Sequence, residues 1–506
     1  MKKTPLLLIF LSLLGSCSIQ DGSSISVLRQ SSSSKESSFA SSSARSQESS
    51  SEEEISSIDS SYTSSEPDKP VSSDFLSFFD YSNRSKITIT ASSEVLSFIS
   101  DYQNKKTNRY SDAYLPVDLS IEFNGETYVY EEVGIRMKGN ISRSRFYDDG
   151  FMGLVHFKVS LKATFDSEVY SDRLLAPFKH DWSSDLAGRK NRKDRNFLGL
   201  EKFDLKYIPR NGESQIRETY CFDRFRNDGI YAPYTNIIDF TLSDGHGSLS
   251  SAYQITETID KEFLKRRMGK QESSGDLYKC TYNSMGKADF SRSGAVNTST
   301  FIREKYGKIG VKDSYSLYFP TYDLKTNDDG ENSDFANMAN LIKVLWTIVY
   351  NRGSRQELEK AIDIDSFLHF SAATYLLGNF DDQRYDYNNF YVYFRPSDNK
   401  AIFLPYDWDW SLGLDLSGVT ATLKPLDPYT LDGGNNSNLY QAVLFGQSGT
   451  AIDQSGYREK YLQYVSSISA FYLDIDAFST MAESIGITDE IVSVRRYMDA
   501  KKGNFE

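Results

Sequence analysis

Two short clusters of carboxylates and amides in the C-terminal third of the chain have the residue types for chemistry. The first reads Gly-Asn-Phe-Asp at residues 378–381 and is followed by Asn388 and Asn389. The second reads Tyr-Asp-Trp-Asp at residues 406–409. Both clusters are flanked by β-forming aromatic residues, where polar side chains are unfavourable unless they share a task. The pattern therefore indicates one polar site built from both clusters.

The segment between the clusters predicts a β-hairpin that brings them together. Residues 390–394 and 401–406 flank a Pro-Ser-Asp-Asn turn at residues 396–399. Folding about this turn places Asn389 opposite Tyr406 or its neighbours, and so beside Asp407. Asn and Asp oxygens converging from hairpin ends suit Mg²⁺, which carries phosphates. Asp381 is then available as a base or orienting group, and this arrangement indicates phosphoryl transfer. The alternative role of Asp381 is structural, as an N-cap or turn residue after the preceding helix.

The first 73 residues predict export and anchoring rather than a fold. Residues 1–17 contain two lysines, an apolar run from Pro5 to Leu14 and a Leu-Gly-Ser-Cys ending. This ending resembles a lipobox, in which Cys17 is lipidated and becomes the new N-terminus; the alternative is an ordinary signal peptide. Residues 18–73 are rich in serine and predict a disordered tether. We therefore expect a protein held by a lipid anchor on the extracytoplasmic face of a bacterial cell membrane.

The net charge and the cysteine and histidine content limit which partners, disulfides and metal sites the sequence predicts. The net charge of −13 argues against nucleic acid as a partner. Cys221 and Cys280 could form a disulfide in an exported protein or lie buried as single thiols. The four histidines include no closely spaced pair, so a zinc site is not expected.

Periodicity predicts an α+β protein with a β-rich part, residues 74–260, before a helical part, residues 261–506. A hairpin signal stands out, with strands at 117–123 and 127–131 around an Asn-Gly turn. The other expected strands cover residues 86–90, 133–138, 157–164, 234–242 and 251–258. The expected helices cover a short segment capped at residues 92–93 and running through 102, and residues 213–227, 335–350 and 366–377, with a capping box at Ser354 to Glu357 and further helices from about residue 454. A β-rich lobe followed by a helical lobe is the layout of kinase-like folds.

Six motifs in order resemble the CotH kinase family of spore-coat and cell-surface proteins. They lie at residues 134–140, 157–159, 216–218, 260–264, 378–381 and 406–409. The resemblance covers roughly residues 86–414. It implies a two-lobed, atypical protein-kinase-like fold and an enzyme that uses ATP and Mg²⁺ to phosphorylate Ser or Thr of protein substrates.

The resemblance assigns roles to the acidic clusters. Asp381 matches the family's catalytic Asp, which accepts or orients the proton of the substrate hydroxyl. Asn389 and Asp407 match the residues that hold Mg²⁺ on the nucleotide phosphates. Asp409 is either a second metal contact or a structural hydrogen-bonding residue.

The resemblance also supplies a nucleotide-binding lysine and glutamate. Lys158 matches the family's phosphate-contacting lysine, with Lys162 as the second choice on the same face of the strand. Glu218 is the expected ion-pair partner of Lys158, as in the Lys–Glu pair of kinases. Its alternative is an exposed glutamate on a helix.

Two further contacts to the nucleotide follow from the resemblance. The turn at Lys138, Gly139 and Asn140 resembles the family's Gly-Asn-Ser turn over the nucleotide, where glycine lets backbone amides approach phosphate. Ile141 replaces the usual serine. Glu257 ends the last strand of the β-rich part and could lie near the adenine.

The leading functional hypothesis is a surface-anchored kinase that transfers the γ-phosphate of ATP to extracytoplasmic proteins. One alternative is a non-catalytic scaffold or adhesion module, that is, a pseudokinase. A third possibility keeps the fold but transfers AMP or another group.

Overall fold

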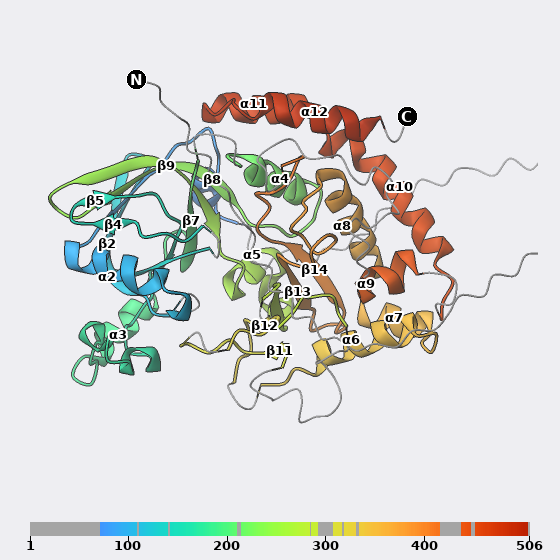
Figure 1. Cartoon of the computed structure of the whole chain (residues 1–506), viewed down its shortest axis with the longest axis horizontal. Coiled ribbons are helices and arrows are strands. Elements are labelled where there is room, and N and C mark those ends of the chain that lie inside the picture. Colours follow the sequence, from blue (N-terminus) through green and yellow to red (C-terminus); the bar gives the residue numbers. More distant parts are fainter. Residues whose placement is uncertain are drawn as a thin grey trace, which may run out of the picture. The chain divides into compact units, whose positions relative to one another are not determined.

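Strands dominate the first half of the computed structural model, which describes residues 71–503 apart from 109–110, 140–141, 210–213, 284, 292–306, 316–317, 330–332, 415–436 and 447–450. The strands of this half are β1 (Lys86–Thr90), β2 (Leu115–Phe123), β3 (Glu126–Met137), β4 (Tyr147–Asp148), β5 (Phe151–Met152), β6 (Phe157–Ser160), β7 (Lys202–Tyr207), β8 (Thr235–Ser243) and β9 (Ser248–Glu257). Within the described residues, seven of them close a barrel in the order β1-β2-β3-β6-β7-β9-β8. Figure 1 labels β2, β7, β8 and β9 of this barrel, on the left of the view. Only the β1–β8 pair in this ring is parallel.

The predicted Asn-Gly hairpin is confirmed as β2 and β3. Asn124 and Gly125 both have positive φ, 51° and 80°, the conformation that a two-residue hairpin turn needs. Buried and exposed residues alternate along β2, with Leu115, Leu119 and other apolar side chains in the barrel core. β3 continues to Met137, whereas β6 ends at Ser160, four residues earlier than the pattern predicts.

Helices surround this barrel and fill the second half of the chain. They are α1 (Ser73–Phe78), α2 (Ser93–Asn104), α3 (Leu186–Lys193), α4 (Arg217–Asn227), α5 (Lys261–Glu272), α6 (Ala336–Val349), α7 (Arg355–Ala361), α8 (Ile364–Leu377), α9 (Asn438–Tyr440), α10 (Ser455–Tyr472), α11 (Ile475–Ile485) and α12 (Ile491–Lys502). The predicted capping box is present, because Ser354 Oγ accepts from the Glu357 N–H and the Glu357 carboxylate accepts from the Ser354 N–H. Gly378, with φ of 57°, ends α8 as expected.

A second sheet lies among these helices, and it corrects the expectation of a helical second half whose only strands are those of the hairpin. In the described part of the chain it comprises β10 (Leu277–Cys280), β11 (Ile309–Gly310), β12 (Tyr322–Leu324), β13 (Phe390–Phe394) and β14 (Ala401–Pro405). Its strand order is β11-β12-β10-β13-β14. The predicted hairpin is β13–β14, paired from Phe390↔Pro405 to Phe394↔Ala401, which confirms the expected register. β10 to β12 are too short to leave an alternating pattern in the sequence.

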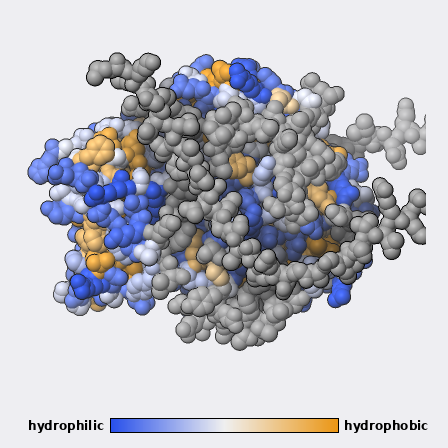
Figure 2. All heavy atoms as spheres, in the orientation of Figure 1, coloured by the Kyte–Doolittle hydropathy of each residue, from blue (hydrophilic) through white to orange (hydrophobic). Residues whose placement is uncertain are grey.

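Two large apolar clusters stabilise these elements. One lies inside the barrel, and the other joins α4, α6, α8, α10, α11 and α12 to the second sheet. On the face shown in Figure 2, hydrophilic residues predominate on the described surface, with hydrophobic residues in small groups. None of the helices in residues 71–503 that the structure describes combines the length and apolar character needed to cross a bilayer.

Cys221 and Cys280 are buried free thiols, so the disulfide alternative is not realised. Cys17, the signal peptide and nearly all of the serine-rich tether lie outside the described residues. The boundaries 74–260 and 261–506 stay predictions.

A buried ion pair connects α4 to the C-terminal helices. Arg217, the first residue of α4, donates from Nε to Glu490 Oε1 (2.7 Å), and the Ile216 N–H donates to Glu490 Oε2 (2.7 Å). The same guanidinium donates to the Leu412 carbonyl (2.6 Å) and to Ser493 Oγ (2.7 Å). The side chains of Arg217 and Glu490 are 4% and 6% exposed, so neither charge has water as an alternative partner.

We predict that Glu490→Ala lowers the free energy of unfolding by about 3 kcal/mol, because it leaves a buried guanidinium without its counter-ion. Denaturant unfolding monitored by circular dichroism measures the change. Glu483→Ala, at an exposed position of α11, is the matched control and should change the stability by less than about 0.5 kcal/mol. Equal effects of the two substitutions would contradict the proposed importance of the buried pair.

Candidate active site

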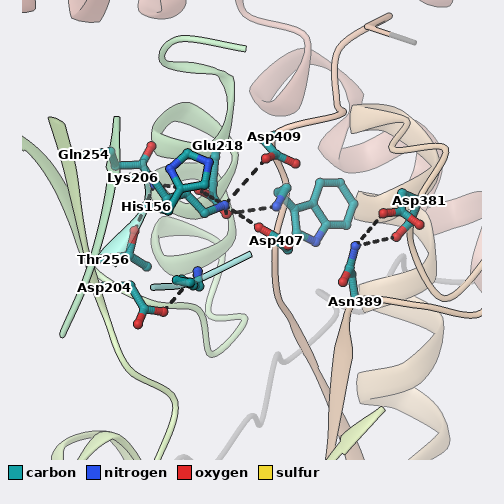
Figure 3. Close-up of polar contacts among 12 residues, drawn as sticks. His156, Asp204, Lys206, Glu218, Gln254, Thr256, Asp381, Asn389, Asp407 and Asp409 are labelled. Atoms are coloured by element: carbon teal, nitrogen blue, oxygen red, sulfur yellow. Dashed lines mark hydrogen bonds and ion pairs between the residues drawn. The ribbon is translucent and has the colours of Figure 1, made fainter. Parts of the chain in front are cut away.

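Lys206 on β7 lies at the centre of a cluster of three carboxylates. Its Nζ donates to both oxygens of Glu218 on α4 (3.0 and 2.8 Å) and to Asp407, and it lies 3.7 Å from Asp409 Oδ2. Figure 3 shows Lys206 with Glu218 on one side and the two aspartates on the other. Burial alone would lower the pKa of Lys206, but Asp407 and Glu218 raise it well above its ordinary value. Lys206 is therefore a permanent cation.

Glu218 is fixed by more than this lysine. Its carboxylate also accepts from Gln254 Nε2 on β9 (2.5 Å) and from the Trp408 N–H (3.0 Å). The side chain is only 3% exposed. A buried carboxylate with this many donors is well satisfied, and it connects the barrel, α4 and the segment after β14 in one arrangement.

The two aspartates beside Lys206 titrate differently. Burial raises the pKa of Asp407, but the ammonium groups of Lys206 and Lys138 outweigh it and hold this pKa well below its usual range. Burial raises the pKa of Asp409 to about 7; Lys206 opposes this shift, and the Asp407 carboxylate adds to it. At neutral pH the cluster therefore holds one firmly ionised carboxylate and one that is partly protonated.

Asp381 is held by the two asparagines that precede β13. Asn388 Nδ2 donates to Asp381 Oδ1 (2.9 Å). Asn389 Nδ2 donates to Asp381 Oδ2 (2.8 Å), as Figure 3 shows. Asn388 is itself fixed, because its Oδ1 accepts from the Tyr282 N–H (2.7 Å). Burial raises the pKa of Asp381 to about 6, while the Asn388 hydrogen bond opposes the shift. Asp381 is thus a basic, oriented carboxylate that is mainly ionised at neutral pH.

Asn389 and Asp407 share an unusual backbone conformation. They flank the hairpin, directly before β13 and two residues after β14, and their φ angles are 54° and 59°. Non-glycine residues rarely adopt positive φ, and such strain persists where the surrounding structure requires it. Asn379 Nδ2 donates to the Asp407 carbonyl (3.3 Å), which connects the segment after α8 to this strained residue.

A cleft of about 650 Å³ lies next to these residues, a volume typical of a small-molecule site. Its lining includes Asn389 and Asp407 together with a pair of lysines bound to one buried carboxylate. Asp204 on β7 accepts from Lys158 Nζ (2.9 Å) and pairs with Lys138 Nζ (3.0 Å). The cleft therefore presents cations and oxygen ligands together, as a phosphorylated ligand with a metal requires.

The glycine turn borders the same cleft. Gly139 has φ of 94°, and a Cβ at this position would lie 2.1 Å from Ser142 Oγ. Arg143 Nε donates to the Gly139 carbonyl (2.6 Å), which fixes the turn. The positive φ therefore favours glycine here, and a larger residue would also require the Ser142 hydroxyl to rotate away. Asn140 and Ile141 lie outside the described residues.

The oxygen atoms present fit a magnesium ion. Asn389 donates its amide group to Asp381, which leaves its Oδ1 as an acceptor, and the structure describes no hydrogen bond to Asp407 Oδ2. Among the described residues, no group of three or more His, Cys, Asp or Glu side chains is arranged to hold a metal. A cation would therefore combine these two side-chain oxygens with oxygens of a ligand, as Mg²⁺ does with nucleotide phosphates.

Two expected roles are wrong. Lys158 does not pair with Glu218; it pairs with Asp204, and Lys206 takes the glutamate. Glu257 does not face the cleft, because its fully buried carboxylate binds Arg266 (2.6 Å) and Arg267 (2.5 Å) in the middle of α5. Its two oxygens are used to attach the end of β9 to that helix.

Lys162, the alternative to Lys158, also lies away from the site. Because β6 ends at Ser160, Lys162 leaves the strand and pairs with Glu201 (2.7 Å). It is absent from the described lining of the cleft.

Lys206 is the residue that the sequence reasoning missed. β7 alternates Phe203, Leu205 and Tyr207 with charged residues, the pattern of a strand with one polar face. β7 is not among the strands that the sequence predicts, because it directly follows a long polar insertion at residues 167–196. The feature that could have identified Lys206 is its placement with Asp204 on the polar face of this strand.

One of three comparisons with known proteins identifies a family for this chain. The sequence model of a family described as CotH kinase protein matches residues 173–491, more than half of the chain. No curated protein matches. A solved structure described as "Crystal structure of A Helicobacter pylori proinflammatory kinase CtkA" is similar at 12% identity, covering 60% of this chain and 87% of that one. Its TM-score of 0.28 is too low to carry an argument.

The family match contains some of the site residues and not others. Glu218, Asp381, Asn389 and Asp407 lie within it, and so does Lys206. The glycine turn and Lys158 precede residue 173, so their place in the site depends on the geometry of the barrel.

We predict that Lys206→Met destabilises the protein by about 3 kcal/mol or more, because it leaves Glu218 buried without its cation. Lys86→Met is the control, since Lys86 pairs with Glu122 on the surface, and its effect should stay below about 1 kcal/mol. Chemical unfolding measured on both variants distinguishes them. A change below about 1 kcal/mol for Lys206→Met would show that the cluster is not stabilised through this lysine.

Proposed function

The chain belongs to the CotH kinase family, and on this premise we propose that it is a surface-anchored protein kinase. It transfers the γ-phosphate of ATP to Ser or Thr of extracytoplasmic proteins. In this proposal the barrel is the N-lobe of a two-lobed fold, and the second sheet with the later helices is the C-lobe. A lipid on Cys17 and the serine-rich tether hold the protein at the membrane.

One observation carries the proposal. Asp381, oriented by two asparagines, lies beside Asn389, which shares its end of the hairpin with Asp407 and the Lys206–Glu218 pair. This combination of an oriented carboxylate, two oxygen ligands and a lysine–glutamate pair meets the requirements of phosphoryl transfer. A scaffold has no need for that set.

Each residue has a role in the transfer. Asp381 accepts the proton of the acceptor hydroxyl, and Asn388 and Asn389 keep its carboxylate in place. Asn389 and Asp407 would hold Mg²⁺, which when bound neutralises charge on the nucleotide phosphates. Lys206, oriented by Glu218, supplies positive charge to the same phosphates. Lys138 and Lys158, both paired with Asp204, add positive charge to the wall of the cleft.

The full chain should transfer labelled phosphate from ATP in a Mg²⁺-dependent reaction, and Asp381→Asn should slow this transfer by about 10²–10⁴-fold through loss of the base. Asp407→Asn should also reduce it, by weakening the metal site. Asp476→Asn, at an exposed position of α11, is the matched control. Transfer that survives both substitutions in folded protein would contradict the proposal, and nucleotide binding without transfer would identify a pseudokinase scaffold. The mass added to the acceptor distinguishes phosphate from AMP.

The pH dependence tests the role of Asp381 separately. Because the pKa of Asp381 is raised to about 6, its carboxylate is protonated below this pH, and kcat/KM should fall about tenfold per pH unit there. Asn388→Ala removes a hydrogen bond that lowers this pKa, so it should move the midpoint to higher pH. Initial rates between pH 5 and 8 measure both effects. A rate that does not change across this range, or a midpoint that moves to lower pH, would exclude Asp381 as the titrating base.

A further inference from the structure

Most lysines that line the cleft have a carboxylate partner. Lys138 and Lys158 share Asp204, Lys312 pairs with Asp112 (2.7 Å), and Lys325 pairs with Asp323. These pairs offset much of the charge on the cleft wall without a ligand.

Lys279 on β10 differs from these residues. No hydrogen bond or ion pair joins its Nζ to any residue in the part of the chain that the structure describes. The ammonium group lies 4.2 Å from the ring centre of Tyr406, and Lys138 Nζ lies 5.3 Å from the same centre. Burial and the like charge of Lys138 lower the pKa of Lys279 to about 7. Without a ligand the amine is therefore only partly protonated at neutral pH, because the groups around it do not compensate its positive charge.

The position of Lys279 in the sheet directs it to the cleft. Its neighbours Tyr278 and Cys280 face the large apolar cluster of the helices, so Lys279 lies on the opposite face of β10. On that face it is directly opposite Tyr391 of β13, and Tyr391 and Tyr406 also line the cleft. Asn389 lies two residues before Tyr391, at the cleft end of the same strand.

A purely structural role does not account for this placement. The contact with the Tyr406 ring contributes about 0.5–2 kcal/mol, which an apolar side chain of similar length would largely replace by packing. An unpaired, partly buried lysine beside a second lysine becomes favourable when an anion binds between them. The cleft also borders Asp407, so the anion that fits here carries a metal-binding phosphate group.

We propose that Lys279, together with Lys138, binds a phosphate group of the nucleotide from the β10 side of the cleft. This inference rests on the proposed function, because it takes the ligand of the cleft to be a nucleoside triphosphate. It adds a phosphate-binding residue from the second sheet to the lysines supplied by the barrel. Lys279 thereby favours a polyphosphate nucleotide over a nucleoside.

Binding of MgATP and of adenosine to the full chain, measured by isothermal titration calorimetry, tests the proposal. Lys279→Met should weaken MgATP binding by about tenfold or more and leave adenosine binding unchanged, because a charge-assisted hydrogen bond to phosphate is lost. Lys279→Arg should keep most of the affinity. Lys343→Met, at an exposed position of α6, is the matched control.

The outcomes separate the two proposals. If the wild-type chain binds neither MgATP nor adenosine, the proposed function itself fails. If it binds MgATP and Lys279→Met binds it within twofold of Lys343→Met, only the role of Lys279 is overturned. Inorganic phosphate is titrated in the same way. If Lys279→Met loses phosphate binding but keeps MgATP binding, Lys279 binds an anion other than the nucleotide, and its proposed role is also overturned. Lys279→Gln provides the same comparison if Lys279→Met does not fold.

Discussion

Removing the Lys206 ammonium from water is unfavourable unless carboxylates surround it, and two other elements of the protein supply them. Lys206 comes from the barrel, Glu218 from α4, and Asp407 from the segment after β14. Because each carboxylate accepts from the same Nζ, none of these elements can move far without leaving a charge unpaired. The relative position of the barrel strand, the helix and the hairpin is therefore set by one cation. The Trp408 N–H and Gln254 complete the donors to Glu218 and make the arrangement specific.

The residues near the site show what sequence patterns can predict. The β13–β14 hairpin was predictable because its turn residues and alternating aromatics fix the register within the segment itself, and that register brings Asn389 towards Asp407. The partner of Glu218 was not predictable in the same way. Lys158 and Lys206 are both strand lysines, and only the order β6-β7-β9 in the barrel decides which one lies over α4. Strand order depends on contacts between residues that are far apart in the sequence. The local alternation of apolar and polar residues does not reveal those contacts.

Short strands were the other source of error. β11 has two residues and β12 three, so neither carries a repeating pattern, yet β12 pairs with β10 and so helps to present Lys279. Glu257 illustrates a different limit: a carboxylate at a strand end is a plausible ligand contact until two arginines of the next helix are found bound to it. In both cases tertiary partners decided the role, and local sequence did not.

The site combines residues inside and outside the region that matches the family. Asp204 lies inside the matched region and holds Lys138 and Lys158, which precede it. One buried carboxylate thus attaches the earlier strands and the glycine turn to the part of the chain that carries Asp381 and Asp407. The barrel strands before residue 173 are therefore part of the site and not a separate addition to it.

The ion pair between Arg217 and Glu490 bears on the order in which the chain can mature. The two residues are 273 positions apart in the sequence, with the barrel strands β8 and β9 and the whole second sheet between them. Chains are made from the N-terminus, and early segments begin to fold while later ones are still being synthesised. The barrel strands can pair at that stage, but the start of α4, which positions Glu218, has its counter-ion only after the segment that contains Glu490 has been made. A chain that stops before Glu490 would thus lack the counter-ion of Arg217 at the start of the helix that positions Glu218.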